Sequence, residues 1–192
     1  MAIQTLYHYT VGLKLRSIFA EGHLRLAPRK PRYPERGVVW LSANPTYELS
    51  ALKVGMTPDG VMTVLTLEQM RVACQGLYRF VVAPAALDLP LYPWEILKTR
   101  ARIKDKVRAT MLRTAGECGA NFAEWFGVMA PLPVDNLPLE IMEGGVWRAI
   151  SPAEALGQAA IDDGTRILQA TMSQMPAGRR VPEGGFVPGA IW

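Results

Sequence analysis

The sequence predicts a single α+β domain, because of its composition and the order of its apolar segments. The chain has 192 residues, of which 49% are hydrophobic, enough for one globular core. Segments typical of strands and helices are interspersed, but without the repeating strand, helix, strand order of a parallel α/β sheet. No phosphate-binding loop of the form GxGxxG, GxxxxGKS or GxxxxGKT occurs. We expect one domain over residues 1–175 and an extended or mobile tail over 176–192, which is rich in Gly, Pro and Arg.

Turn-forming residues divide the first half of the chain into short elements. A run of β-branched and aromatic residues predicts the first strand, and apolar residues at helical intervals predict a helix that Gly22 ends. Asn44 and Pro45 predict a turn and the N-terminus of a second helix, which carries Tyr47. In order, we expect a strand over 3–9, the helix up to Gly22, a strand over 24–26, a proline-rich loop over 28–37, a strand over 38–42 and the helix after Asn44.

The second half alternates apolar strands with helical segments. Residues 94–114 combine many charges with apolar residues at helical intervals, which fits one surface helix. Ser151 is the expected N-cap of an Ala-rich helix that has Pro152 at its first position and reaches about Ala170. The remaining strands are expected over 61–67, 77–82, 124–129, 139–142 and 146–150.

Composition also bounds the setting and the chemistry. No stretch approaches the ~20 apolar residues that cross a bilayer, and the opening lacks the features of a secretory signal. We therefore expect a cytoplasmic protein with no membrane partner. Cys74, Cys118 and two histidines do not form a cluster of zinc ligands, so no metal is expected and the cysteines are expected to be free thiols.

Positive charge is concentrated in two segments. The net charge of +4 favours an anionic cofactor or a nucleic-acid partner without proving either. The basic residues of the first segment are Arg25, Arg29, Lys30, Arg32 and Arg36. Those of the second, on the expected surface helix, are Lys98, Arg100, Arg102, Lys104, Lys106 and Arg108. A charged face that only keeps the protein soluble is the competing interpretation.

Three groups of residues stand out as candidates for chemistry. They are Leu6-Tyr7-His8-Tyr9-Thr10, then Gly22 to Pro28 with Val38 to Ser42 and Tyr47, then Ala123-Glu124-Trp125-Phe126-Gly127-Val128. Together they resemble the ADP-ribosyltransferase superfamily of the diphtheria-toxin-like or poly-ADP-ribose-polymerase kind, whose signature is His, then Tyr, then Glu. The His-Tyr-Thr opening is similar to the toxin branches, which include DNA-modifying enzymes. The resemblance spans roughly residues 6 to 142.

This resemblance implies a fold, a co-substrate and a reaction. The fold would be a split β-sheet core with flanking helices, and the co-substrate would be NAD. The enzyme would break the nicotinamide-ribose bond and pass ADP-ribose to a macromolecular acceptor, which is DNA, RNA or protein. The implied NAD-binding residues are His8, Tyr9, Thr10, Arg25, Trp40, Ser42 and Tyr47.

Each implied role has a plainer alternative. His8 would bond the ribose next to nicotinamide, or it is a satisfied core histidine. Thr10 would add a hydroxyl near the same sugar, or it caps the following helix. Arg25 would pair with an NAD phosphate, or it is a solvated surface arginine. Tyr47 would stack on the cationic nicotinamide, with Tyr33 as a substitute. Trp40 is either the aromatic neighbour of that ring or a buried strand residue.

Glu124 is the expected catalytic carboxylate, acting with His8. Cleavage of the glycosidic bond develops positive charge on the ribose, which a fixed carboxylate stabilises. Glu48, Glu117 and Glu140 are its rivals. Phe122 stands two residues before Glu124, where arginine-modifying members carry Gln or Glu, so arginine is a doubtful acceptor.

Two other functions stay open from the sequence. One is a non-catalytic nucleic-acid-binding module that uses the basic segments. The other is NAD-dependent RNA 2′-phosphotransfer, for which Arg16, Arg25 and Arg71 are loosely placed. The sequence leaves open whether the protein is a toxin with a cognate antitoxin, a phage-encoded host modifier or a regulator.

Overall fold

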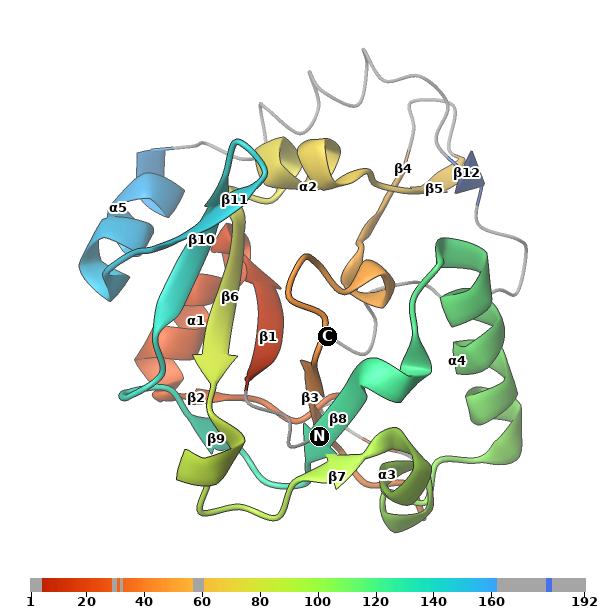
Figure 1. Cartoon of the computed structure of the whole chain (residues 1–192). Coiled ribbons are helices and arrows are strands. Elements are labelled where there is room, and N and C mark those ends of the chain that lie inside the picture. Colours follow the sequence, from red (N-terminus) through yellow and green to blue (C-terminus); the bar gives the residue numbers. More distant parts are fainter. Residues whose placement is uncertain (1–4, 29–30, 32, 57–60, 162–178, 181–192) are drawn as a thin grey trace.

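The computed structural model describes residues 5–28, 31, 33–56, 61–161 and 179–180 (Figure 1). Its largest element is a seven-stranded antiparallel sheet. The strands are β1 (Leu6–Val11), β3 (Val39–Ser42), β6 (Leu77–Val82), β7 (Tyr92–Pro93), β8 (Trp125–Val128), β10 (Leu139–Glu143) and β11 (Val146–Ala149). Their spatial order is β11-β10-β6-β1-β3-β8-β7. Helices accompany this sheet, so the α+β prediction is confirmed.

Two smaller sheets and five helices surround the large sheet. The small sheets pair β2 (His23–Leu24) with β9 (Leu132–Pro133), and β5 (Met62–Val64) with both β4 (Val54–Met56) and β12 (Arg179–Arg180). The helices are α1 (Gly12–Glu21), α2 (Leu67–Ala73), α3 (Trp94–Arg100), α4 (Asp105–Cys118) and α5 (Pro152–Ile161), with single 3-10 turns η1 (Leu49–Ala51), η2 (Pro84–Ala86) and η3 (Phe122–Glu124). None of the helices in the described part of the chain has the length and apolar character needed to cross a membrane.

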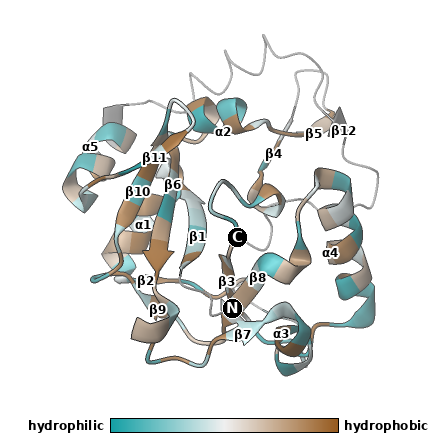
Figure 2. Ribbon diagram, in the orientation of Figure 1, coloured by the Kyte–Doolittle hydropathy of each residue, from teal (hydrophilic) through white to brown (hydrophobic). Residues whose placement is uncertain are grey.

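Strand alternation gives the sheet two buried faces. On one face, residues such as Leu6, Phe80 and Leu41 pack against Leu15 of α1 and Ala155 of α5. The other face packs against α2 at one end, in a cluster with Tyr9, and against α3 and α4 at the other end, in a cluster with Trp40. Figure 2 shows hydrophobic colour on β8 and on parts of β6 and β10, and both colours on α4. The sheet is therefore covered on both sides.

The large sheet is split between β1 and β3. Strand β1 pairs with β6 along its whole length, from Leu6 opposite Val82 to Val11 opposite Leu77. In contrast, the described register of β1 with β3 consists of Tyr7 opposite Ser42. The sheet thus has two halves, which meet at this residue pair and diverge toward the C-terminal end of β1.

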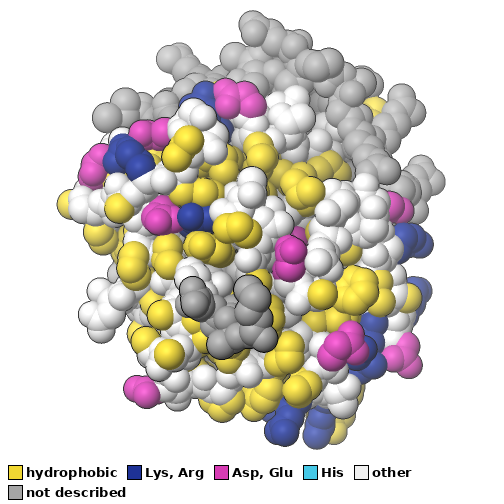
Figure 3. Space-filling view, viewed as in Figure 1, with side chains coloured by type: hydrophobic (Ala, Val, Ile, Leu, Met, Phe, Trp, Pro, Cys, Tyr) yellow, Lys and Arg dark blue, Asp and Glu magenta, His cyan; other side chains and the backbone are white. Residues whose placement is uncertain are grey.

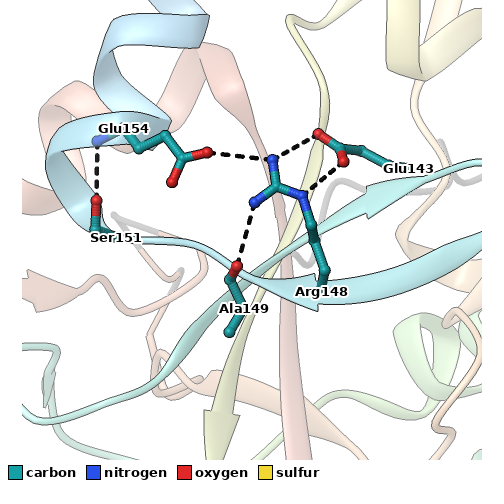
Figure 4. Close-up of polar contacts among 5 residues, drawn as sticks. All are labelled: Glu143, Arg148, Ala149, Ser151 and Glu154. Atoms are coloured by element: carbon teal, nitrogen blue, oxygen red, sulfur yellow. Dashed lines mark hydrogen bonds and ion pairs between the residues drawn. The ribbon is translucent and has the colours of Figure 1, made fainter.

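The α5 helix is attached to the edge of the sheet by a charged group (Figure 4). Arg148 of β11 donates to both carboxylate oxygens of Glu143, at 2.6 and 2.8 Å, and to Glu154 of α5 at 3.2 Å. The Arg148 hydrogen bond lowers the pKa of Glu143. The Ser151 hydroxyl accepts from the Glu154 amide at 3.2 Å, as its predicted role as N-cap requires.

The helix expected after Asn44 is absent, and that prediction is wrong. The described chain has a turn there, followed by the single 3-10 turn η1. The Asn44 side chain accepts from the amides of Thr46 and Tyr47, at 2.9 and 3.3 Å. The carbonyl oxygens of Asn44, Pro45 and Thr46 accept from side chains of other strands, so they are unavailable for helical bonds.

The single helix expected over 94–114 is also wrong, because the segment forms α3 and α4. Arg102 between them has a left-handed backbone with φ of 54°. The Ile103 amide donates to Lys98 at 3.0 Å, and the Arg108 guanidinium donates to the carbonyls of Ile103 and Lys98 at 2.6 and 3.0 Å. Ala101 and Ile103 are buried, and their packing accounts for the break.

Other expected boundaries shift by a few residues. Gly22 ends α1 in the left-handed conformation, as predicted. Strand β2 stops at Leu24, short of the expected 24–26, and β5 ends at Val64, before Thr66 and Gln69 form a capping box for α2. Glu124 ends η3 and so lies just before β8. Positions beyond Ile161, where the Ala-rich helix and the tail were expected, lie outside the described residues except for 179–180.

Candidate functional site

A cavity of about 340 Å³ lies beside the C-terminal end of β1, where the two halves of the sheet diverge. Its walls come from four parts of the chain. They are His8 to Val11 of β1, then Lys14, Ser17 and Ile18 of α1, then Leu24 to Pro28, and finally Lys53. Four of the predicted NAD-binding residues, His8, Tyr9, Thr10 and Arg25, therefore line one cavity.

His8 is a buried and neutral histidine. Its Nδ1 atom lies 2.9 Å from the carbonyl oxygen of Trp40. Burial lowers the pKa of His8 to about 4, so the ring is uncharged at neutral pH. A carbonyl oxygen can only accept, so Nδ1 carries the proton and Nε2 is a hydrogen-bond acceptor. This tautomer can accept a hydrogen bond from a hydroxyl group.

Three cationic side chains line the cavity, namely Lys14, Arg25 and Lys53, and no acidic residue is among its described walls. Burial and the charge of Lys14 lower the pKa of Lys53 to about 8. Arg25 pairs with Glu21, which offsets part of its charge. The walls therefore favour an anionic ligand, and ammonium and guanidinium groups are the usual partners of phosphate.

Thr10 does not cap α1, and it is one of the residues that line the cavity. The N-cap of α1 is Val11, without a side-chain hydrogen bond. Thr10 is buried and lies on the same face of β1 as His8, since strand residues two apart point the same way. The β1 segment thus offers an imidazole and a hydroxyl side by side.

Tyr47 lies outside the cavity. It is buried in the cluster on the α2 face, and its ring centroid is 4.8 Å from that of Tyr9. Burial raises its pKa. Side chains from three strands hold the turn before Tyr47. The Tyr9 hydroxyl donates to the Asn44 carbonyl, the Arg79 guanidinium donates to the Pro45 carbonyl, and the Trp147 indole donates to the Thr46 carbonyl at 2.8 Å.

Ser42 and Glu48 form a buried polar pair away from the cavity. The Ser42 hydroxyl donates to Glu48 at 2.8 Å, and the other oxygen of Glu48 accepts from the amide and hydroxyl of Ser50 at 3.1 and 2.7 Å. Glu48, a rival for the catalytic role, thus has hydrogen bonds to both carboxylate oxygens. Its described contacts are those of a structural group.

Trp40 packs on the face of the sheet opposite to His8. Its indole belongs to a group of three tryptophans, 6.2 Å from Trp94 and 6.2 Å from Trp125. Only its backbone reaches the site, through the carbonyl that bonds His8. Among the described residues, no hydrogen-bond partner is present for the indole nitrogens of Trp40 and Trp125.

Glu124 lies at the start of β8, beyond the walls of the cavity. Its carbonyl accepts from the Ala43 amide at 2.8 Å, which extends the β3–β8 pairing by one residue. Because Glu124 ends η3, strand alternation does not determine the direction of its side chain. Asn121 donates to Oε1 at 3.4 Å, whereas Oε2 is buried without a hydrogen-bond partner among the described residues.

Sequence reasoning missed Lys14 and Lys53. Lys14 follows Thr10 by four residues and lies in the first turn of α1, so its position could have been noticed once β1 and α1 were recognised. Lys53 comes from the segment between η1 and β4, and no local motif indicates that it reaches β1.

Within the described ranges, no group of three or more His, Cys, Asp or Glu side chains could hold a metal ion.

Comparisons of the chain with protein-family models, with curated proteins and with solved structures returned no match. Function is therefore inferred from the side chains and their geometry.

Proposed function

We propose that the protein is an ADP-ribosyltransferase that binds NAD in the cavity beside His8 and transfers ADP-ribose to a macromolecular acceptor. The observation that carries this proposal is the composition of the cavity. A neutral imidazole and a hydroxyl lie with three cationic side chains at the split of the sheet. NAD has the complementary groups, namely ribose hydroxyls and a pyrophosphate.

The split sheet supports the same function. The family that the motifs resemble has a split β-sheet core with its histidine on the first strand. Here β1 carries His8, and the two halves of the sheet diverge next to it. His8 to Thr10 would hold the ribose, while Lys14, Arg25 and Lys53 would hold the pyrophosphate.

Glu124 is the proposed catalytic carboxylate. One of its oxygens lacks a hydrogen-bond partner among the described residues, so we assign to it a hydrogen bond from a ribose hydroxyl and opposition to the positive charge that develops on the sugar. Because Glu124 lies beyond the cavity walls, NAD has to extend out of the cavity for its nicotinamide end to reach this carboxylate. Glu48 is a weaker candidate because both its oxygens are bonded.

RNA 2′-phosphotransfer is less well supported. That chemistry relies on several arginines around the sugar and phosphate, and of the three placed by sequence only Arg25 lines the cavity. Arg16 is exposed on α1, and Arg71 pairs with Glu68 and lines a different cavity.

The test is release of nicotinamide and transfer of label from labelled NAD into a cell lysate. Wild type should label protein or nucleic acid, and Glu124→Gln should reduce the labelling at least ~100-fold, the scale of a lost electrostatic group in a transition state. Glu117→Gln is the matched control, since Glu117 is exposed on α4, and it should keep full activity. Equal activity of Glu124→Gln and wild type would remove Glu124 from the mechanism.

A further inference from the structure

The second of the two basic segments carries a large share of the protein's positive charge. Residues 94–113 hold seven basic and two acidic side chains, a net charge of +5, whereas the whole chain has +4. The rest of the chain is therefore close to neutral. This segment is therefore one place to which a polyanion would be attracted.

The break between α3 and α4 turns these charges outward. Ala101 and Ile103 are buried, and the basic residues that alternate with them, Arg100, Arg102 and Lys104, are exposed. Lys106 is also exposed, in the first turn of α4. Arg108 differs, because its guanidinium bonds backbone carbonyls. A row of exposed cations results at the α3–α4 junction.

A distant part of the chain joins this row. The Arg36 amide donates to the Ala101 carbonyl at 2.8 Å, and the Glu35 carboxylate accepts from the Lys104 amide at 3.4 Å. These bonds bring exposed Arg36 to the α3–α4 junction. We call Arg36, Arg100, Arg102, Lys104 and Lys106 the basic surface. Figure 3 shows Lys and Arg side chains gathered over α3 and α4, at the bottom and right of the view.

An exposed aromatic side chain belongs to the same loop as Arg36 of the basic surface. Tyr33 is 89% exposed, the largest exposure among the large hydrophobic residues of the described chain. It lies three residues before Arg36 in the loop that is docked on the junction. An exposed ring beside cations is the usual arrangement for a stacked base next to its phosphates.

The basic surface is connected to the cavity through the backbone. Arg36 lies two residues before Val38, and Val38 exchanges two hydrogen bonds with Ala27, at 2.8 and 2.9 Å. Ala27 is part of the cavity wall. Because α3 and α4 pack on the face of the sheet opposite to His8, a polymer bound along the basic surface has to pass from that face to the other to reach the cavity.

We infer that the basic surface binds the phosphate backbone of single-stranded nucleic acid and that Tyr33 stacks on one of its bases. This inference rests on the proposed function, for which it identifies the acceptor as a nucleic-acid strand. The charges supply affinity without sequence preference, and the ring favours unpaired bases over a duplex.

Binding is measured by fluorescence anisotropy over a range of salt concentrations. The probes are a short labelled single-stranded DNA of mixed sequence, the corresponding RNA, and the duplex DNA. Arg102→Gln/Lys106→Gln removes two charges from the basic surface, and Arg16→Gln/Arg71→Gln removes two exposed charges elsewhere. At ~0.1 M salt each lost phosphate contact weakens binding about fivefold, so the first variant should bind roughly 25-fold more weakly, with a shallower salt dependence.

The control variant should bind single strands within about twofold of wild type. Equal losses in the two double variants, or no binding of either single strand by wild type, would overturn the inference. Tyr33→Ala should weaken single-strand binding about fivefold or more and leave duplex binding unchanged. A duplex bound as tightly as the single strands would contradict the assignment to unpaired bases.

Nicotinamide release from NAD, with water as the acceptor, separates this inference from the proposed function. Arg102→Gln/Lys106→Gln should keep that release while transfer to the oligonucleotide falls. If neither the wild-type protein nor the variant consumes NAD, the proposed function is wrong. The anisotropy measurements then still decide whether the basic surface binds nucleic acid.

Discussion

The Nδ1 atom of His8 lies 2.9 Å from the carbonyl oxygen of Trp40, across the line where β1 and β3 diverge. On its β6 edge, β1 is held by backbone hydrogen bonds along its whole length. On its β3 edge, the His8 side chain supplies a bond to the neighbouring strand instead. His8 therefore links the two halves of the sheet and also forms part of the cavity wall. Substitutions at this position should affect stability and ligand binding separately.

Replacing His8 by Asn or by Ala distinguishes the roles of its two ring nitrogens. The Asn amide can retain the bond to the Trp40 carbonyl, whereas Ala leaves that carbonyl without its partner at a cost of about 1–3 kcal/mol. We expect His8→Asn to unfold in urea close to wild type but to lose NAD binding, and His8→Ala to lose both. Calorimetry with NAD checks the binding. Unchanged NAD affinity in both variants would show that the ring does not touch the ligand.

Stability should depend on the protonation of His8. Its pKa is about 4 in the folded protein and 6.5 as a reference for the unfolded chain, so the unfolded state binds more protons between these values. Above pH 6.5 the histidine is neutral in both states and should not change the free energy of unfolding. As the pH falls from 6.5 to 4, protonation of the unfolded state should lower the free energy of unfolding by about 3 kcal/mol in total. Urea unfolding of wild type and His8→Gln across this pH range isolates the effect, since carboxylates contribute to both proteins equally.

The affinity of the cavity for anions should fall as the pH rises through about 8. Lys53, whose pKa is lowered to about 8 by burial and by Lys14, then loses its positive charge. Titration with NAD at pH 7 and pH 9 should show this loss in wild type. Lys53→Gln should bind weakly at both pH values, with a much smaller change between them. A wild-type affinity that is constant across this range would exclude Lys53 from phosphate binding.

Two glycines permit close backbone packing that any side chain would prevent. A Cβ on Gly12 would lie 1.9 Å from the carbonyl oxygen of Gln75, and one on Gly127 would lie 2.4 Å from a methyl group of Val38. We expect Gly127→Ala to cost about 1–3 kcal/mol in urea unfolding, and Gly12→Ala to cost more because backbone has to move. Gly116→Ala is the control: Gly116 lies in α4 with nothing within 4 Å, so it should gain about 0.5–1 kcal/mol.

Substitution of Arg79 should lower the stability of the protein more than substitution of most other charged residues. Its guanidinium lies 4.0 Å from the Tyr7 ring centroid and 4.4 Å from that of Trp147, and it donates to Glu140 at 2.6 Å. Arg79→Met leaves Glu140 without this partner and should lower the free energy of unfolding by about 3–5 kcal/mol. Arg79→Met with Glu140→Gln should recover part of the loss. A single variant with wild-type stability would show that this ion pair adds nothing.

Local signals in the sequence located much of the fold. Gly22, Ser151 and the apolar run over β6 act on their immediate neighbours, so their roles could be predicted without knowledge of the tertiary structure. The break at Arg102 and the turn after Asn44 could not, because residues distant in sequence determine them. Trp147, for example, bonds the carbonyl of a residue 101 positions earlier.

The candidate site divides in the same way. His8, Thr10 and Arg25 were predicted from short motifs, and they line one cavity with Lys14 and Lys53. Tyr47 was expected on a helix, yet it packs in the core, since the turn before it is bonded to three strands. The catalytic role of Glu124 stays a prediction, and its nearest test is the labelling experiment with Glu124→Gln.

The three consecutive carbonyls of Asn44, Pro45 and Thr46 have a mechanical consequence. Each is anchored by a side chain from a different strand of one sheet half, whereas the turn itself follows directly on β3 of the other half, so it ties the two halves together. Any relative movement of the two halves at the split between β1 and β3 would require these side chains to release the turn.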